Sequence, residues 1–112
     1  MSWYQFNNGK SIGHRGSENG IVIRDEEHAG GARITLEQGG GTAPLAITCG
    51  IYGWMVHTRF FGAESEAQTD FENMKAELNK IIDLIPLTTD REVNSKKQAV
   101  VYSISQFVQR FP

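Results

Sequence analysis

The residues that could do chemistry lie mostly in the first half of this 112-residue chain. Residues 25–28 read Asp-Glu-Glu-His, and carboxylates and imidazoles together can bind a transition metal. With the two other histidines of the chain, the candidate ligands are His14, Asp25, Glu27, His28 and His57. Adjacent residues do not project in one direction, however, and the His-Glu-x-x-His spacing that places two ligands on one helix face is absent. We therefore interpret residues 25–28 as a charged, solvated hairpin connection and expect neither a metal nor another cofactor.

Cys49 and His57 are the second candidate pair, because a thiolate nucleophile needs a base within hydrogen-bond reach. In one extended strand, the stretch between them spans roughly 26 Å, which excludes a catalytic pair. If the chain instead reverses around Gly53, the two residues face each other across a hairpin. The sequence leaves both arrangements open. Free cysteines are commonly buried as small apolar groups, so we expect Cys49 to belong to the core.

Two glycine-rich stretches lack the motifs of known phosphate or hydrolase sites. Residues 13–20 contain neither Gly-x-Gly-x-x-Gly nor a Gly-Lys-Ser/Thr ending, and a strand pattern follows them instead of a helix. Residues 39–41 are consecutive glycines, and the chain has no Gly-x-Ser-x-Gly elbow. We therefore expect flexible loops at both places, with no nucleotide site and no serine hydrolase.

The large side chains between residues 52 and 61 are the strongest indication of a binding role. In a strand, one face carries Tyr52, Trp54, Val56, Thr58 and Phe60, and the other carries Met55, His57, Arg59 and Phe61. One face suffices for a core, so the surplus either packs under the loop of residues 11–20 or forms an interface. Trp, Tyr, Met and Arg are enriched at interface centres. The predicted interface comprises Trp54, Met55, Arg59 and Phe61, with a homodimer as its simplest form.

Composition excludes several classes of function. With 11 Lys and Arg against 13 Asp and Glu, the formal charge is -2, so no basic field attracts nucleic acid or an anionic membrane. No apolar run approaches the ~18 residues of a membrane span. A lone Cys49 closes no internal disulfide, and no basic start leads into an apolar run, so we expect a cytoplasmic protein. The length fits a single domain over residues 1–112.

All 12 glycines lie between Gly9 and Gly62, which divides the domain into a strand-and-turn half, 1–62, and a helical half, 63–112. Strands are predicted at 2–6, 21–25 and 32–37, the last with Ala32, Ile34 and Leu36 facing inward. Asn8-Gly9 favours a tight turn, and residues 26–31 connect two strands. Residues 46–61 form either one long bent strand or two strands.

Two apolar stripes predict helices in the second half. The first comprises Phe71, Met74, Leu78, Ile81, Ile82 and Ile85, and the second comprises Val93, Val100, Val101, Ile104, Phe107, Val108 and Phe111. The first helix is expected over 65–85, where Pro86 ends it, and the second runs nearly to the end of the chain. Candidate capping boxes are Ser65 with Gln68, Thr69 with Glu72, and Thr89 with Glu92. The short connection makes the helices antiparallel.

These patterns predict an α+β domain of two layers, in which an antiparallel sheet of four or five strands is followed by a C-terminal antiparallel two-helix hairpin packed on one face. Size, slight acidity and the lack of a catalytic signature are compatible with small bacterial interaction proteins, including immunity-type inhibitors of toxins, an analogy of class that no particular residues carry. We expect a noncatalytic binding or regulatory module that associates with a protein partner or with itself. The alternative is a small metal-dependent or thiol enzyme that uses the histidines and carboxylates of the first half. The sequence indicates no particular small-molecule ligand.

Overall fold

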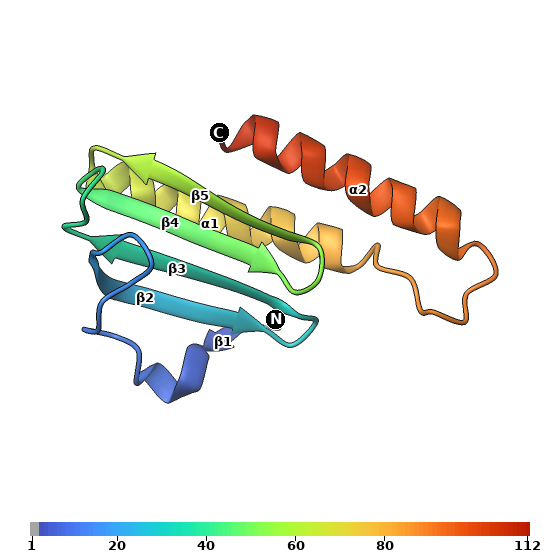
Figure 1. The fold of residues 1–112 in the computed structure, drawn as a ribbon, viewed down its shortest axis with the longest axis horizontal. Coiled ribbons are helices and arrows are strands. Elements are labelled where there is room, and N and C mark those ends of the chain that lie inside the picture. The colour runs from blue at the N-terminus through green and yellow to red at the C-terminus, as the bar shows by residue number, and fades with distance from the viewer. Residues whose placement is uncertain (1–2) are drawn as a thin grey trace.

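Five antiparallel strands form one sheet in the order of the sequence, and two helices follow them (Figure 1). The computed structural model describes residues 3–112. The strands are β1 (Trp3–Gln5), β2 (Ile21–His28), β3 (Ala32–Gln38), β4 (Leu45–Ile51) and β5 (Met55–Phe61). The helices are α1 (Glu64–Ile82) and α2 (Val93–Arg110), and a 3-10 turn, η1 (Phe6–Gly9), follows β1. Ser2, the first residue of the predicted first strand, lies outside the described residues.

The helices cover one face of the sheet, which confirms the two-layer α+β architecture. In Figure 1, α1 crosses behind the sheet and α2 runs back in the opposite direction beside it. Ala32, Ile34 and Leu36 point toward the helices and are fully buried, as their alternation predicts. We call the other side of the sheet the open face. Neither α1 nor α2 packs on it.

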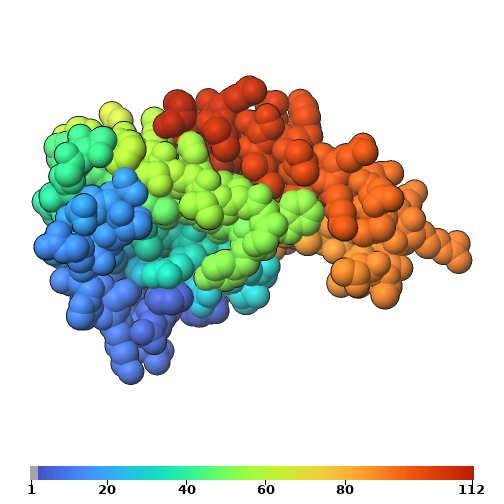
Figure 2. Space-filling model, in the orientation of Figure 1, coloured from blue at the N-terminus to red at the C-terminus, as the bar shows by residue number. Residues whose placement is uncertain are grey.

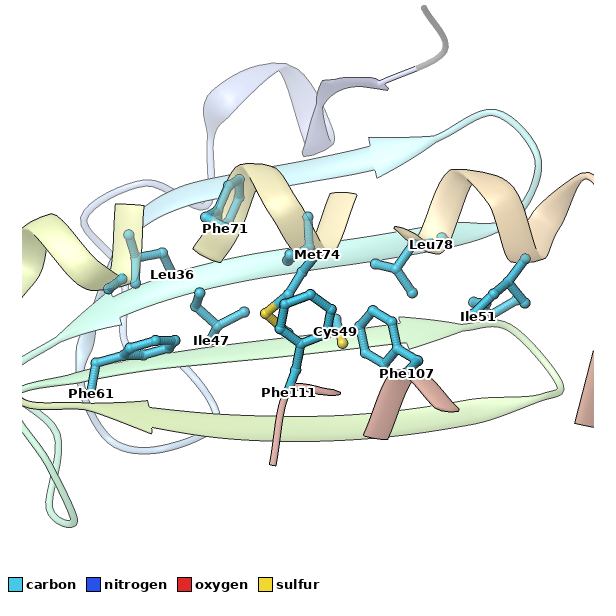
Figure 3. Packing of buried hydrophobic residues seen from close by; sticks show 14 of the residues in the cluster. Leu36, Ile47, Cys49, Ile51, Phe61, Phe71, Met74, Leu78, Phe107 and Phe111 are labelled. Carbon is cyan, nitrogen blue, oxygen red and sulfur yellow. The ribbon is translucent and has the colours of Figure 1, made fainter. Parts of the chain in front are cut away.

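The core lies between the sheet and α1 and is closed at one edge by the end of α2. Figure 3 shows Leu36, Ile47 and Ile51 of the sheet opposite Met74 and Leu78 of α1. The aromatic side chains that close the edge are Phe61, Phe107 and Phe111. Large apolar groups from both layers are thereby removed from water, which is the main stabilising contribution in a domain of this size.

The expected connection at residues 26–31 is wrong, because β2 continues to His28 and only residues 29–31 connect it to β3. The charged residues of β2 are accommodated because each has a partner. Glu26 accepts from Arg24 at 2.8 Å and from Lys75 of α1 at 2.6 Å. On the same face, Nε2 of His28 lies 2.6 Å from Oδ1 of Asn79. Residues 26–28, whose charged and polar character predicts a solvated connection, therefore belong to a strand, because ion pairs and hydrogen bonds to residues distant in the chain satisfy them.

Residues 46–61, left open by the sequence, form two strands. β4 and β5 pair in register from Leu45 with Phe61 to Ile51 with Met55, and Gly53 takes a φ of 82° in the turn between them. The first turn is also as expected, since Asn7, Asn8 and Gly9 all have positive φ.

The helix ends differ from the sequence prediction. α1 ends at Ile82, four residues before Pro86, and Ile85 lies beyond it. Among the described residues, neither helix has a side-chain capping hydrogen bond, so the proposed capping boxes are wrong. Thr69 instead donates to the carbonyl of Ser65 inside α1.

Within residues 3–112, neither helix combines the length and apolar character that a membrane span needs.

Candidate functional site

The open face carries a cleft of about 710 Å³. Its floor is formed by β3 and β4, one wall by the loop from Ser11 to Ser17, and the other by the β4–β5 hairpin. Figure 2 looks onto this face, with the N-terminal segment in blue on one side and the hairpin in green on the other. The volume lies within the range of small-molecule and peptide pockets. A second groove, of about 330 Å³, lies between α1 and α2.

Glu37 fastens the loop that forms the first wall. Its side chain leaves β3 on the open face, is buried, and accepts hydrogen bonds through Oε1 from the backbone N–H groups of Glu18 and Gly20, at 3.0 and 2.9 Å. Gly16 passes so close that a Cβ there would lie 2.6 Å from Oε2 of Glu37. The buried carboxylate thereby joins the loop to the sheet, in addition to backbone hydrogen bonds between Val22 of β2 and both Gly13 and His14 of the loop.

Asp25 and Arg33 lie side by side at the floor of the cleft. Arg33 donates from Nε to Oδ1 of Asp25 at 3.0 Å and from Nη2 to Oδ2 at 2.7 Å. Oδ2 also accepts from the hydroxyl of Ser11 at 2.8 Å. The guanidinium carbon of Arg33 lies 3.5 Å from the centre of the Phe6 ring, a stacked cation–π geometry. The bonds to Asp25 raise the pKa of Arg33, so its charge is permanent.

Hydroxyl groups line the middle of the floor. Oγ1 of Thr48 lies 3.3 Å from Oγ1 of Thr58 and 3.4 Å from Oγ of Ser17, which links β4, β5 and the loop. Next to Thr48 on the same face is Gly50, and a Cβ there would lie 3.0 Å from the carbonyl oxygen of Met55. The missing side chain at Gly50 leaves the floor hollow between Arg33 and Val56, its partners on the two neighbouring strands.

The hairpin wall is mainly apolar. It comprises Tyr52, Trp54, Met55 and Val56, of which Val56 is 82% and Tyr52 57% exposed. The Tyr52 hydroxyl donates to Glu27 at 2.9 Å, and burial together with this bond raises the pKa of Tyr52. The cleft therefore combines a fixed charged group on its floor with an apolar surface on the hairpin.

The five candidate metal ligands do not come together. Asp25 and Glu27 project onto the open face, whereas His28 and His57 project toward the helices. His14 lies on the loop that lines the cleft. Among the described residues, no group of three His, Cys, Asp or Glu side chains could hold a metal ion.

Cys49 and His57 are directly opposite one another on β4 and β5, which answers the question that the sequence left open. Both side chains, however, lie on the side of the sheet that faces the helices, and His57 is half-buried there. Cys49 is buried in the core (Figure 3), and burial raises the pKa of its thiol to about 12. His57 has its own partner, with Nε2 2.5 Å from the carbonyl oxygen of Phe111. The thiol is protonated at neutral pH and is not an activated nucleophile.

The four predicted interface residues are divided between two places. Trp54 and Met55 are half-buried, contact the core and line the cleft. Phe61 is buried, and Arg59 lies over it on the helix side, where it pairs with Asp70 at 3.3 Å. An anchoring role for Phe61 would require that side chain to leave the core.

Comparisons with family models, curated proteins and solved structures find no match to this chain. The site therefore rests on its geometry alone. Sequence reasoning missed Arg33, Thr35 and Glu37, although a signal was present. They alternate with the inward-facing residues of β3 and must share the open face. What the sequence lacked was a sign that the loop would fold over that face.

Proposed function

We propose that the protein is a noncatalytic binding module that acts through protein–protein association, and that the cleft on the open face receives a segment of its partner. The observation that carries this proposal is the cleft itself, on the side of the sheet that α1 and α2 leave uncovered. Binding sites are concave, mostly apolar and fitted with a few placed polar groups. The cleft has these properties.

The groups in and near the cleft favour binding over catalysis. A nucleophile needs an adjacent base, and a base must be free to accept a proton. Ser11 donates to Asp25, whose two oxygens are already engaged by Arg33. Cys49 has a raised pKa. A metal-dependent or thiol enzyme, the alternative from sequence, has less geometric support than a binding module.

An extended segment of another protein suits the shape of the site. The cleft is open to solvent along the sheet, and the exposed Tyr52 and Val56 at its rim offer apolar contact of the kind that anchors a bound segment. A small cytoplasmic inhibitor of a bacterial toxin is one module of this type. Its partner would be the toxin.

Self-association is the competing occupant of this surface. β5 is an edge strand, and Val56 and Phe60 are exposed on its open face. A second copy could cover them by two-fold contact, giving a homodimer. Light scattering of the wild type at increasing concentration separates the two cases. If the wild type forms a dimer as its concentration rises, and Tyr52→Ser/Val56→Ser is monomeric, the occupant of this surface is a second copy of the chain and not another protein.

Selection from a random peptide library displayed on phage tests the proposal for a partner segment of any sequence. We expect enriched peptides that bind the wild type and bind Tyr52→Ser/Val56→Ser at least about tenfold more weakly, as for loss of interface anchors. The matched control is Leu87→Ser/Tyr102→Ser, which removes an exposed aliphatic and aromatic pair outside the cleft. Failure to enrich any peptide, or equal binding to both double variants, would overturn the proposal.

A further inference from the structure

Arg33 is held on two sides yet retains unused hydrogen-bond donors. Asp25 fixes Nε and Nη2, and Phe6 covers one face of the guanidinium. Nη1 has no hydrogen-bond partner within residues 3–112, and the side chain is 37% exposed where it lines the cleft. A guanidinium has five N–H groups in a planar fork, so a side chain oriented in this way can still bind an oxygen ligand through its free edge.

The charges of the cleft lining are of the opposite kind to those of the whole chain. Arg15 and Arg33 line it, and among the described residues Asp25 is the only acidic one that does. The Asp25 side chain is 0% exposed, and its oxygens already accept from Arg33 and Ser11. Glu27, its neighbour on the open face, accepts from the hydroxyls of Tyr4 and Tyr52. Glu27 keeps its negative charge but is not among the residues that line the cleft, so the lining itself carries two guanidinium groups against one buried carboxylate and presents the free donors of Arg33 to a ligand.

We propose that the cleft recognises an acidic side chain, aspartate or glutamate, in an extended segment of the partner protein, with the carboxylate bound at the free edge of Arg33. An apolar neighbour of that residue packs against Tyr52 and Val56 on the hairpin wall. Charged hydrogen bonds to a guanidinium are strong when the guanidinium is already oriented, because little side-chain entropy is lost on binding. This inference rests on the proposed function, since it names the chemistry of the segment that the cleft receives.

Pairs of synthetic peptides test the inference. Each selected peptide is compared with its counterpart in which Asp is replaced by Asn or Glu by Gln, by titration calorimetry against the wild type. We expect the acidic peptide to bind about tenfold to a hundredfold more tightly, the range for a hydrogen bond to a charged group. Equal binding of the acidic and amide peptides would overturn the inference and leave the proposed function standing.

Variants of the ion pair locate the carboxylate. Arg33→Gln alone leaves Asp25 as an unpaired buried charge and risks unfolding. The double variant Asp25→Asn/Arg33→Gln removes both charges, keeps the net charge of the chain and retains polar side chains at both positions. We expect it to bind acidic and amide peptides equally, whereas Arg91→Gln, an exposed site outside the cleft, keeps the difference. A preference for acid that persists in the double variant would show that another group binds the carboxylate.

A small carboxylic acid is the other source of the same chemistry. The probe is 4-phenylbutanoate, which combines a carboxylate with one apolar group and has no peptide backbone. We expect it to bind at least about tenfold more weakly than the acidic peptide, because it makes fewer contacts along the cleft. Binding as tight as that of the peptide would assign the cleft to a small acid and overturn the partner segment. Selection of no peptide would overturn the proposed function and this inference together.

Discussion

Asp25 and Arg33 occupy diagonal positions on β2 and β3, and two hydrogen bonds join them on the open face of the sheet. The carboxylate is buried and the guanidinium is partly exposed. Asp25 thus orients Arg33 toward the cleft without itself reaching solvent. Cross-strand pairs of opposite charge stabilise a sheet, and here the same pair also shapes its surface.

Substitution of Arg33 by Gln is expected to destabilise the fold by about 3 kcal/mol, because the carboxylate of Asp25 then remains buried without its charged partner. The double variant Asp25→Asn/Arg33→Gln should recover much of this loss, since no buried charge remains. Urea unfolding of the wild type, both single variants and the double variant measures the coupling. Additive losses would show that the pair does not act as a unit.

Glu37→Ala is expected to cost about 1–3 kcal/mol and to release the loop that forms one wall of the cleft, because the N–H groups of Glu18 and Gly20 lose their shared acceptor. Glu37→Gln should cost less, since its amide oxygen can still accept. Hydrogen exchange at these two amides reports on the loop directly. Unchanged protection of both amides in Glu37→Ala would contradict the role assigned to Glu37.

The buried thiol of Cys49 makes stability fall at alkaline pH. Its pKa is raised from 9.0 to about 12 in the folded protein, so between these values the unfolded chain loses a proton that the folded chain keeps. The free energy of unfolding should therefore be unaffected by this group below pH 9 and decline by about 1.4 kcal/mol per pH unit above it.

Cys49→Ala is the control for this effect, because other groups titrate in the same range. The difference in unfolding free energy between wild type and Cys49→Ala should depend on pH only above about 9. At pH 8, Ellman's reagent should likewise react with the thiol of Cys49 only after the protein has unfolded. Rapid reaction of the folded protein would place the thiol near the surface.

Leu78→Ala is expected to cost about 2–5 kcal/mol in urea unfolding, because the side chain is fully buried between α1 and the sheet. Its neighbour Glu77 is half-exposed and pairs with Lys80 and Arg110, so Glu77→Ala should cost less than about 1 kcal/mol. Equal losses for the two variants would contradict the packing of α1.

Ile104→Ala should fall between Leu78→Ala and Glu77→Ala. The sequence pattern places Ile104 at the centre of the second stripe, but the side chain is only half-buried and packs against the edge of the core. A loss as large as that of Leu78→Ala would show that α2 packs more closely than the structure indicates.

The sequence determined the layers of this protein because the periodicity of its apolar residues is local information. Ala32, Ile34 and Leu36 alternate as a strand with one buried face requires, and Phe71, Met74 and Leu78 recur as a helix requires. Glycine gave the turn at Gly53 its positive φ, although the sequence alone did not show that the chain reverses there. Connections of three to six residues join β2, β3, β4 and β5 in turn, so these strands pair with their neighbours in the chain, whereas residues 6–20 separate β1 from β2.

Only the tertiary structure decided which charged residues are buried and where the cleft lies. Residues 25–28 look like a solvated turn until Arg33, Lys75 and Asn79 are brought to them from β3 and α1. The wall of the cleft depends on Glu37 reaching Glu18 and Gly20, about 17 to 19 positions earlier in the chain. A polar side chain carries no sign in sequence of the distant group that satisfies it, because that partner is set by the packing of the whole chain.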